Sequence, residues 1–469
     1  MINKPERPHT VSDTNELILA RDRQLEDFSG FLDVDGAGGL PSLKASRKAA
    51  IERFAEIGFP DRRNEDWKYT NVAPIARTAF ARPTGEIPYI DAAELAPYRF
   101  GDDSSPRLVF VDGRYAPSLS TNGATTKGVT LLPLAEAVRT RAADVEPWLG
   151  QCLDDTNRPF AALNTAFFED GVFLHLEKGV RVESPIELVF IATAGGDTPL
   201  ASHPRIVIGA EAGAVATVTE THVGVGEGVS LTNVATEIMA REGAHVFHYR
   251  TTHLPDEAFH ISTLAVRQEG KTDVTSCTIS IGGRITRNDY HAIMAGEDGL
   301  CALRGLAKLR GREHVDNHLR VEHAAPACES REYFKSVLED ESRSAFTGRI
   351  FVHQIAQKTD GKQTNSNLLL SENAQADSRP QLEIFADDVK CTHAALTGQL
   401  DEDAIFYLRA RGLSEREATS ILVRAFAGEI IDTIKVDALR ELVEERLFSR
   451  ESSIDAGAPG KSGALQEAV

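Results

Sequence analysis

The sequence has few cysteines, and none of them stand in the short pairs that redox motifs and many zinc sites use. Only five occur in 469 residues, they are widely spaced, and no Cys-x-x-Cys is present. An odd and scattered set argues against a disulfide framework and favours a reducing compartment. The five are Cys152, Cys277, Cys301, Cys328 and Cys391.

The chain also lacks a long apolar run and an excess of positive charge. No stretch approaches the roughly 20 apolar residues of a membrane span, and residues 1–15 are polar, unlike a signal peptide. Lys and Arg number 51 against 70 Asp and Glu, which gives a formal net charge of −19. Because phosphate binding needs clustered cations, this balance argues against nucleic acid or an anionic membrane as a partner. The sequence predicts a cytoplasmic protein.

Residues 1–170 are expected to form a mainly helical N-terminal domain. Apolar residues recur at helical spacing over residues 14–60 and again over residues 133–168. Between them, residues 107–115 have the pattern of a strand followed by a turn. The helices of this region predict a cap or a cover for whatever follows.

From residue 171 to residue 400, short alternating strands replace the helices and a repeat is present. A glycine that follows an acidic or small residue precedes a strand four times, at Gly213, Gly243, Gly270 and Gly299. The gaps between these glycines are regular, at roughly 27 to 30 residues by subtraction of their numbers. A repeat of this length made only of strands predicts a β-solenoid, in which each coil stacks on the next. A β-sandwich, which also spaces its strands regularly, remains the alternative.

Residues 401–448 are expected to be helical again, and residues 449–469 to form a flexible tail. Ser414 and Glu417 have the spacing of a capping box at a helix N-terminus. The helix behind them has a broad apolar face that includes Phe426. Such a face predicts packing against the end of the solenoid or against a partner protein.

Cys391 and His393 are the candidate metal ligands. If the chain around them is extended, side chains two residues apart share a face, with Cα atoms roughly 6.6 Å apart. A thiolate beside an imidazole is a donor pair that iron–sulfur, zinc and copper sites use. Two ligands do not close a site, so the others would come from elsewhere, for example another chain. The alternative is a small buried thiol next to a hydrogen-bonded surface histidine.

A second group of donor residues lies close together in sequence, at His314, His318, His323 and Cys328. The local pattern is that of strands, where His314 and His318 would lie about 13 Å apart on one face. That separation is too great for two ligands of one ion. The pattern therefore favours a polar ladder or an interface over a metal cluster.

Two further motifs carry no function by themselves. Gly460-Lys461-Ser462 resembles the end of a phosphate-binding loop, but Asp455 stands where the loop needs a glycine and no strand precedes it. Asp387 and Asp388 are paired acids, yet adjacent strand residues face opposite sides and would not flank one glycosidic bond.

Four motifs follow one another along almost the whole chain. They are Arg62–Thr70 (RRNEDWKYT), Gln354–Leu370 (QIAQKTDGKQTNSNLLL), Pro380–His393 (PQLEIFADDVKCTH) and Phe406–Gly412 (FYLRARG). Together, and in this order, they resemble the SufB/SufD family of the Suf iron–sulfur cluster assembly machinery. The first motif and the DDVKCTH ending resemble its SufD members more than its SufB members. Within the first motif, we expect Trp67 to be packed as a structural anchor and the charged residues to be solvated.

The resemblance implies a mainly β protein, with a right-handed parallel β-helix (β-solenoid) core flanked by N-terminal and C-terminal α-helical regions. It implies a non-enzymatic scaffold that pairs with a SufB-like subunit through the β-helix and binds the SufC ATPase through residues 401–448. The family's cluster-assembly position falls on His393, with Cys391 two residues before it.

The same resemblance implies a transient nascent iron–sulfur cluster shared with SufB and no cofactor bound permanently by the isolated chain. The isolated chain could also homodimerise through the edge that SufB would cover. The alternatives are a SufB-like subunit, a β-helix carbohydrate-active enzyme and a free-standing zinc-binding module.

Overall fold

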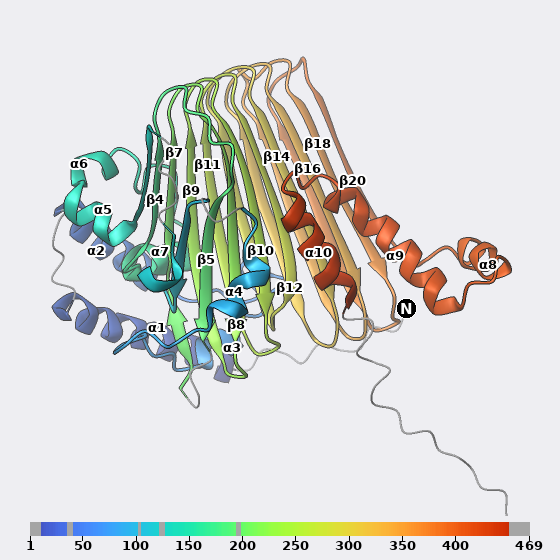
Figure 1. The fold of residues 1–469 in the computed structure, drawn as a ribbon, viewed down its shortest axis with the longest axis horizontal. Coiled ribbons are helices and arrows are strands. Elements are labelled where there is room, and N and C mark those ends of the chain that lie inside the picture. Colours follow the sequence, from blue (N-terminus) through green and yellow to red (C-terminus); the bar gives the residue numbers. More distant parts are fainter. Residues whose placement is uncertain (1–10, 35–40, 102–104, 122–126, 194–197, 450–469) are drawn as a thin grey trace, which may run out of the picture.

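The centre of the computed structural model is a parallel β-solenoid (Figure 1). The structure describes residues 11–34, 41–101, 105–121, 127–193 and 198–449. Successive coils place strands alternately in two ten-stranded sheets, and the coil-to-coil pairing is parallel. The prediction of a mainly β solenoid flanked by helices is confirmed, and the sandwich alternative is wrong.

We name the two sheets after their last strands. The β20 sheet contains, in spatial order, β2 (Arg114–Tyr115), β1 (Arg107–Val111), β5 (Ile186–Thr193), β8 (Val215–Val225), β10 (His245–Leu254), β12 (Asp273–Gly282), β14 (Leu300–Leu309), β16 (Glu329–Leu338), β18 (Asp360–Leu369) and β20 (Lys390–Gly398). The β19 sheet contains β19 (Gln375–Ile384), β17 (Arg343–Val352), β15 (His314–His323), β13 (Ile285–Met294), β11 (Phe259–Gln268), β9 (Ser230–Ala240), β7 (Arg205–Ala210), β4 (Gly171–Leu176) and β3 (Val129–Pro133), with β6 (Leu200–Ser202) beside β9.

The repeated glycines mark one set of turns between the sheets. Gly213 and Gly243 have φ of 72° and 69°, in the left-handed region that favours glycine. Each turn returns the chain one strand further along the stack, so that positions one repeat apart become neighbours. Tyr249, for example, pairs with Thr219 before it and Cys277 after it. The sequence repeat is therefore the length of one coil.

Side chains that alternate along each strand point either into the solenoid or out of it. The inward set forms the main core, in which Val274, Leu303 and Phe334 are fully buried. The outward side chains are apolar as well where helices cover the sheets, as in the clusters under the N-terminal and C-terminal helices. The interior of the solenoid and the covered parts of both outer faces are all buried. Some strands are therefore apolar on both faces, and their sequences are nearly continuous apolar runs.

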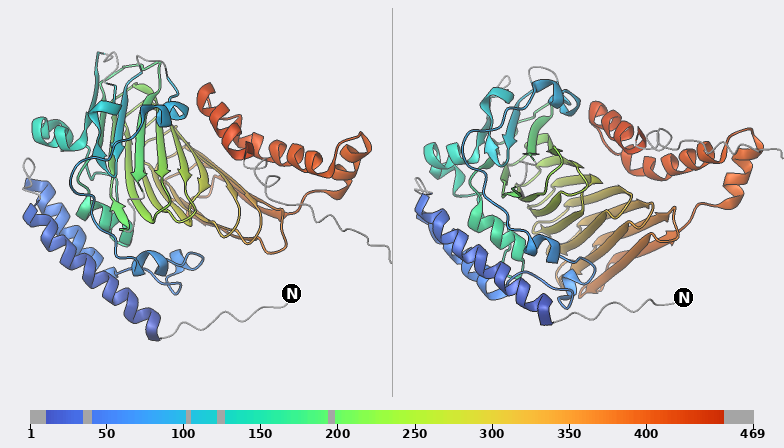
Figure 2. Two further views of the ribbon diagram at one scale, coloured as in Figure 1. Left: turned by 60° about the horizontal axis from the view of Figure 1, so that its bottom comes forward. Right: turned by 90° about the horizontal axis from the view of Figure 1, so that it is seen from below.

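Apart from the short helical turns at residues 92–98 and 117–119, which pack on the β20 sheet, the N-terminal helices cover the outer face of the β19 sheet (Figure 2). Phe28 and Phe54 from these helices pack in one cluster with Phe259 and Ile261 of β11. The helices and short turns before residue 170 are α1 (Val11–Val34), α2 (Pro41–Ile57), η1 (Glu65–Trp67), α3 (Ala73–Arg77), α4 (Ala92–Leu95), η2 (Ala96–Tyr98), η3 (Pro117–Leu119), α5 (Leu134–Thr140), α6 (Ala142–Val145) and α7 (Pro159–Phe167).

The RRNEDWKYT segment lies across the same outer face. Trp67 is buried, as expected of an anchor, and the guanidinium of Arg287 lies 4.0 Å from the centre of its ring. The charged side chains of this segment are largely exposed, as expected, but Asp66, which is 52% exposed, also has an ion-pair partner. Its carboxylate lies 3.3 Å from Nε2 of His318, and the hydrogen bond from that imidazole lowers the pKa of Asp66 to about 2. The segment is thus held by ion pairs as well as by its tryptophan.

The C-terminal helices are α8 (Glu402–Ala410), α9 (Glu415–Ile431) and α10 (Asp437–Ser449). The capping box predicted for Ser414 and Glu417 is present at the start of α9. Helices α9 and α10 cover the outer face of the β20 sheet, on the side opposite to the N-terminal helices (Figure 2). Helix α8 projects away from the body (Figure 1). Residues 450–469, including Gly460-Lys461-Ser462, lie outside the described residues.

None of the described helices is both long enough and apolar enough to cross a membrane.

Candidate metal centre at the open end of the solenoid

Strand β20 is the last strand of its sheet, and it pairs with β18 alone among the described strands. Its backbone edge on the other side is unpaired within the part of the chain that the structure describes, as is the edge of β19 in the opposite sheet. Large apolar side chains are exposed here, among them Phe385 (59% exposed) and Leu396 (61% exposed). Unpaired strand edges beside exposed apolar groups are a surface that another chain covers well.

Cys391 and His393 share the inward face of β20. Cys391 is in register with Gly361 of β18, and His393 with Gln363, and both partners are buried. Cys391 is half-buried and packs beside Ile350. His393 is exposed, because the stack of coils ends here and no further described coil covers its ring. The two donors therefore stand side by side at an opening.

The surroundings of Cys391 disfavour the ionised form of its thiol. Burial raises its pKa, and the nearby carboxyls Asp360 and Glu332 raise it further. A metal ion must displace the proton of a thiol to bind it, so ligation here depends on the charge of the ion itself. No three His, Cys, Asp or Glu side chains among the described residues are arranged to hold a metal ion. Cys391 and His393 could supply two donors, one thiolate and one imidazole, and a complete site would need further donors from outside the described residues.

Below this opening lies a buried carboxyl that sequence reasoning missed. Glu332 is 2% exposed, and its Oε2 accepts a hydrogen bond from Nε2 of Gln363. Burial raises the pKa of Glu332 to about 8. The coil length is a signal for its neighbours alone, because Glu332, Gln363 and His393 follow one another at intervals of one coil and occupy equivalent positions of successive strands.

We expect the Glu332→Gln variant to be more stable than the wild type in alkaline solution. Below the ordinary glutamate pKa of 4.5 the carboxyl is neutral in both the folded and the unfolded chain. As the pH rises towards about 8, the unfolded chain loses this proton and the folded chain keeps it, so wild-type stability falls. At about 1.4 kcal/mol for each unit of pKa difference, the advantage of the neutral amide reaches a few kcal/mol.

Urea unfolding at pH 4.5 and pH 8.5 measures this difference. The matched control is Glu341→Gln, since Glu341 is exposed beside Arg312 and its removal should leave the pH profile unchanged. A Glu332→Gln effect that is the same at both pH values would contradict a neutral buried carboxyl.

The other predicted donor group is spread over the solenoid. His314 bonds Thr70, and His318 lies between Asp66 and Asp289, all on the outer face of the β19 sheet. His323 lies in the interior and bonds Ser330. These side chains form separate polar contacts and not one cluster, as the strand spacing predicted.

A buried ionic network within the solenoid was also missed. Glu220 bonds Arg250, His222 and His248, and all four side chains are buried. These contacts hold the pKa of Glu220 well below its usual value. Glu220 and Arg250 are one coil apart and in register, so the repeat length again gives the pairing. The network neutralises its own charge and rigidifies the early coils.

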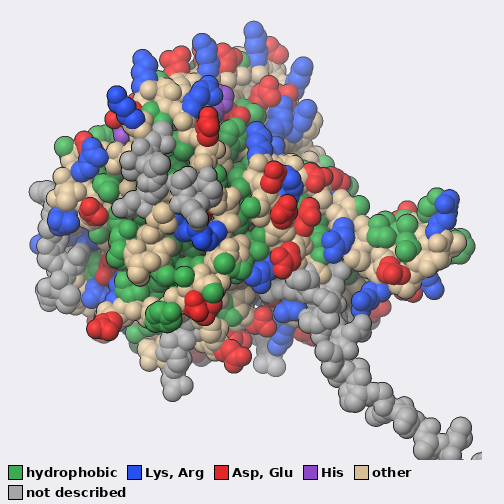
Figure 3. Space-filling model, viewed as in Figure 1, with side chains coloured by type: hydrophobic (Ala, Val, Ile, Leu, Met, Phe, Trp, Pro, Cys, Tyr) green, Lys and Arg blue, Asp and Glu red, His purple; other side chains and the backbone are tan. Residues whose placement is uncertain are grey.

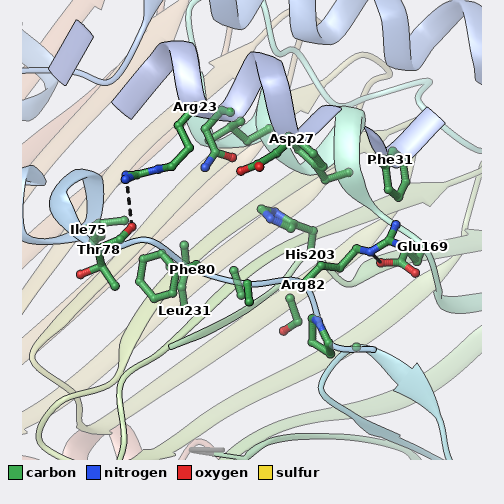
Figure 4. Close-up of a pocket in the computed structure, with 18 of the residues that line it drawn as sticks. Arg23, Asp27, Phe31, Ile75, Thr78, Phe80, Arg82, Glu169, His203 and Leu231 are labelled. Atoms are coloured by element: carbon green, nitrogen blue, oxygen red, sulfur yellow. Dashed lines mark hydrogen bonds and ion pairs between the residues drawn. The ribbon is translucent and has the colours of Figure 1, made fainter. Parts of the chain in front are cut away.

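A cavity of about 270 Å³ lies between α1 and the β19 sheet (Figure 4). Asp27 and His203 face one another across it, and burial lowers the pKa of His203 to about 4. Arg23 on the rim donates to the carbonyls of Ala76 and Thr78. Its lining comes from several distant segments, which explains why no motif predicted it. These polar groups join α1 to the body and lie away from β20.

The C-terminal helices carry a second exposed surface. Phe426, which the apolar pattern singled out, is half-buried: Nζ of Lys335 lies 4.2 Å from its ring centre and donates to its carbonyl. It therefore serves the docking of α9 onto the solenoid. On α8, by contrast, Phe406 and Tyr407 are 73% and 57% exposed, and Figure 3 shows hydrophobic side chains on this projection. We call Phe406, Tyr407 and Ile421 (43% exposed) the α8 surface.

Two family models match this chain, and together they cover most of it. The model described as "SUF system FeS cluster assembly, SufBD core domain" matches residues 190–426. The model described as "SufBD protein N-terminal region" matches residues 34–188. The first match contains the solenoid from β6 onward, with β20 and its two candidate donors.

Known proteins of similar sequence agree with these models. The chain is 30% identical to the iron–sulfur cluster assembly protein SufD of Escherichia coli, over 91% of this chain and 96% of that protein. It is 29% identical to an iron–sulfur cluster assembly SufBD family protein of Synechocystis, over 85% of this chain and 89% of the other. It is 24% identical to SufD of Bacillus subtilis, over 85% and 92%. The likeness extends through the helical and solenoid regions alike.

Proposed function

The chain belongs to the SufB/SufD family of iron–sulfur cluster assembly proteins, and on this premise we propose that it is a SufD-type scaffold subunit. In this role it pairs with a SufB-type subunit through the last coil and binds the SufC ATPase through its C-terminal helices, in the cytoplasm. It carries out no turnover itself and holds a nascent cluster only in transit. One observation carries the proposal: Cys391 and His393 stand together on a terminal strand with one unpaired edge among the described strands.

The pairing with a SufB-type chain is supported by the last coil. The free edges of β19 and β20 offer backbone donors and acceptors to another strand. Exposed apolar groups around them, such as Phe385 and Leu396, supply area that is better buried. A second copy of this chain would find the same edge, so the isolated protein is expected to form a homodimer that the SufB-type chain displaces.

The chemistry at the interface follows from the donor pair. Cys391 loses its proton when a cation arrives, and His393 binds through an unprotonated ring nitrogen. The partner chain and inorganic sulfide complete the coordination of the nascent cluster. Since each chain supplies only part of the ligand set, the cluster is held while both are in place and is released to a recipient afterwards.

SufC binding is assigned to the α8 surface because of its exposure. Helix α8 makes few contacts with the body, and its aromatic side chains are turned outward. Helix α9, by contrast, is anchored by Lys335, which donates to Phe426 and pairs with Glu429 at 2.9 Å. An exposed aromatic group on a projecting helix is suited to a groove on a partner.

Co-expression of the tagged chain with the SufB-type and SufC-type proteins of its own source tests the proposal. A stable ternary complex that acquires an iron–sulfur chromophore on reconstitution is the expected result. Failure to form any complex, or carbohydrate turnover by the isolated chain, would overturn the scaffold assignment.

We expect Phe406→Asp to abolish or greatly weaken SufC binding while SufB pairing persists. The substitution places a charge at the centre of the α8 surface, where a partner would have to desolvate it. Because Phe406 is 73% exposed, folding should change by less than about 0.5 kcal/mol. Co-purification with each partner separately measures the two contacts.

Tyr89→Asp is the matched control, since Tyr89 is an exposed aromatic residue (89%) outside the C-terminal helices. It should bind SufC as the wild type does. Unchanged SufC binding by Phe406→Asp would remove the α8 surface from the proposal.

A further inference from the structure

The imidazole of His393 stands at the end of a column of inward side chains that runs through the β20 sheet. Strands β16, β18 and β20 are parallel and in register, so Glu332, Gln363 and His393 occupy equivalent positions. Neighbouring strands lie about 4.8 Å apart, which places Glu332 two strand spacings, roughly 10 Å, from His393. Gln363 fills the step between them.

Two features hold the side chain of Gln363 in this column: a hydrogen bond to Glu332, and the absence of a side chain at Gly348 opposite it. Its Nε2 donates to Oε2 of Glu332, and both side chains are at most 2% exposed. Across the interior, Gly348 of β17 leaves room for the amide: a Cβ added there would lie 2.3 Å from Nε2 of Gln363. The amide nitrogen is therefore fixed towards Glu332.

The amide oxygen of Gln363, unlike the amide nitrogen, is not fixed by a hydrogen bond in the described part of the chain. It is buried and has no hydrogen-bond partner in the described part of the chain, and the same is true of Oε1 of Glu332. A buried acceptor without a donor is costly, and native proteins normally supply one. The side chain next along the column, on the strand that ends the stack, is His393. An imidazole that binds a metal through one nitrogen carries a proton on the other and needs an acceptor for it.

We propose that Gln363 and Glu332 are positioning residues for His393: the ring N–H of His393 donates to Oε1 of Gln363, whose amide nitrogen is held by Glu332. This inference rests on the proposed function of His393 as a cluster ligand. The chain from carboxyl through amide to imidazole sets which ring nitrogen carries the proton and directs the other towards the interface. Neither residue touches the cluster.

The consequence is a preorganised ligand on an otherwise exposed strand. The rest of β20 is open to solvent, so the ring has little packing to hold it. Outer partners of metal-bound histidines typically change affinity by about 10- to 100-fold. Loss of the acceptor should therefore loosen the cluster without removing a ligand.

The test uses Gln363→Leu in the full chain, alone and in the reconstituted complex with its partners. Long-range nitrogen–proton NMR of histidine-labelled chain reports which nitrogen of His393 is protonated. The wild type should show one dominant tautomer, and Gln363→Leu a mixture. In the complex, transfer of iron from the cluster to a chelator should be about 10- to 100-fold faster in the variant.

A double exchange separates positioning from mere packing. Glu332→Gln combined with Gln363→Glu keeps a hydrogen-bonded pair and places the carboxyl next to His393, so it should restore one tautomer and slow cluster loss. The control is Asn367→Leu, which removes another buried amide from β18, in register with Thr397 and not with His393. It should lower stability and leave the His393 tautomer unchanged.

Two results overturn the inference: a His393 tautomer that is the same in wild type and Gln363→Leu, or failure of the double exchange to restore it. The outcome is separable from that of the proposed function. If His393→Ala loses the cluster while Gln363→Leu behaves as wild type, His393 remains a ligand, but Gln363 and Glu332 do not position it. If His393→Ala keeps the cluster, the ligand itself is wrong.

Discussion

The His393→Ala variant should assemble with both partners and yet retain no more than about a tenth of the wild-type iron–sulfur cluster. The ring is exposed at the end of the solenoid, so its removal leaves no cavity in the core. The cluster, by contrast, loses one of few protein donors, and loss of a ligand costs at least the roughly tenfold effect of disturbing its outer partners. Visible absorbance and iron content of the purified ternary complex measure the yield.

Two controls accompany this experiment. Thr392→Ala changes the neighbour of His393 that points to the opposite face of β20, and it should keep the full yield. His245→Ala removes a half-exposed histidine of the same sheet, which lies 4.0 Å from Asp273, and it should also keep the full yield. A His393→Ala complex with normal cluster content would refute the assignment, whatever the effect on partner binding.

The solenoid could be predicted because its signals are local. Each strand alternates along its own length, and each turn carries a glycine or another residue with positive φ, such as Lys271 and Asp298. The regular gaps between the glycines from Gly213 to Gly299 are the coil length itself. The shared face of Cys391 and His393 followed from the same alternation. None of these inferences required knowledge of a contact distant in sequence.

What could not be predicted depends on contacts between distant segments. The partner of Asp66 is His318, and that of Glu65 is Arg379, so in each case a residue near the N-terminus pairs with a late strand of the solenoid. No periodicity relates the N-terminal segment to the solenoid, so these pairs could not be predicted, although both carboxylates remain more than half exposed. The buried position of Glu332 depends on which face of β16 points inward, and that of its partner Gln363 depends on the space left by Gly348 of the other sheet. The coil length determines which residues neighbour Glu332 in the next strands, but it does not show that Glu332 is buried.

The same distant contacts give the largest expected effect on stability, at Arg287. This side chain is 1% exposed and pairs with Asp289 at 2.7 Å and Asp316 at 2.5 Å. Its Nη1 also donates to the carbonyl of Asp66, and its guanidinium stacks on Trp67. We expect Arg287→Leu to lower the free energy of unfolding by about 3–5 kcal/mol, because the buried carboxylate of Asp316 is left without its cation.

Arg284→Leu is the matched control for this substitution, since it removes an arginine from the turn just before the same strand. Arg284 pairs with Glu257 at 3.0 Å, but both side chains are about half exposed, and such pairs contribute at most about 1 kcal/mol. Urea unfolding measures both variants, and limited proteolysis near Trp67 reports whether the N-terminal segment has left the β19 sheet. A loss for Arg287→Leu no larger than that for Arg284→Leu would mean that the segment is held by Trp67 alone. A larger loss for Arg287→Leu would mean instead that the burial of Trp67 and the neutralisation of Asp316 both depend on the guanidinium of Arg287. This one cation would then couple the N-terminal region to β13 and β15 of the solenoid.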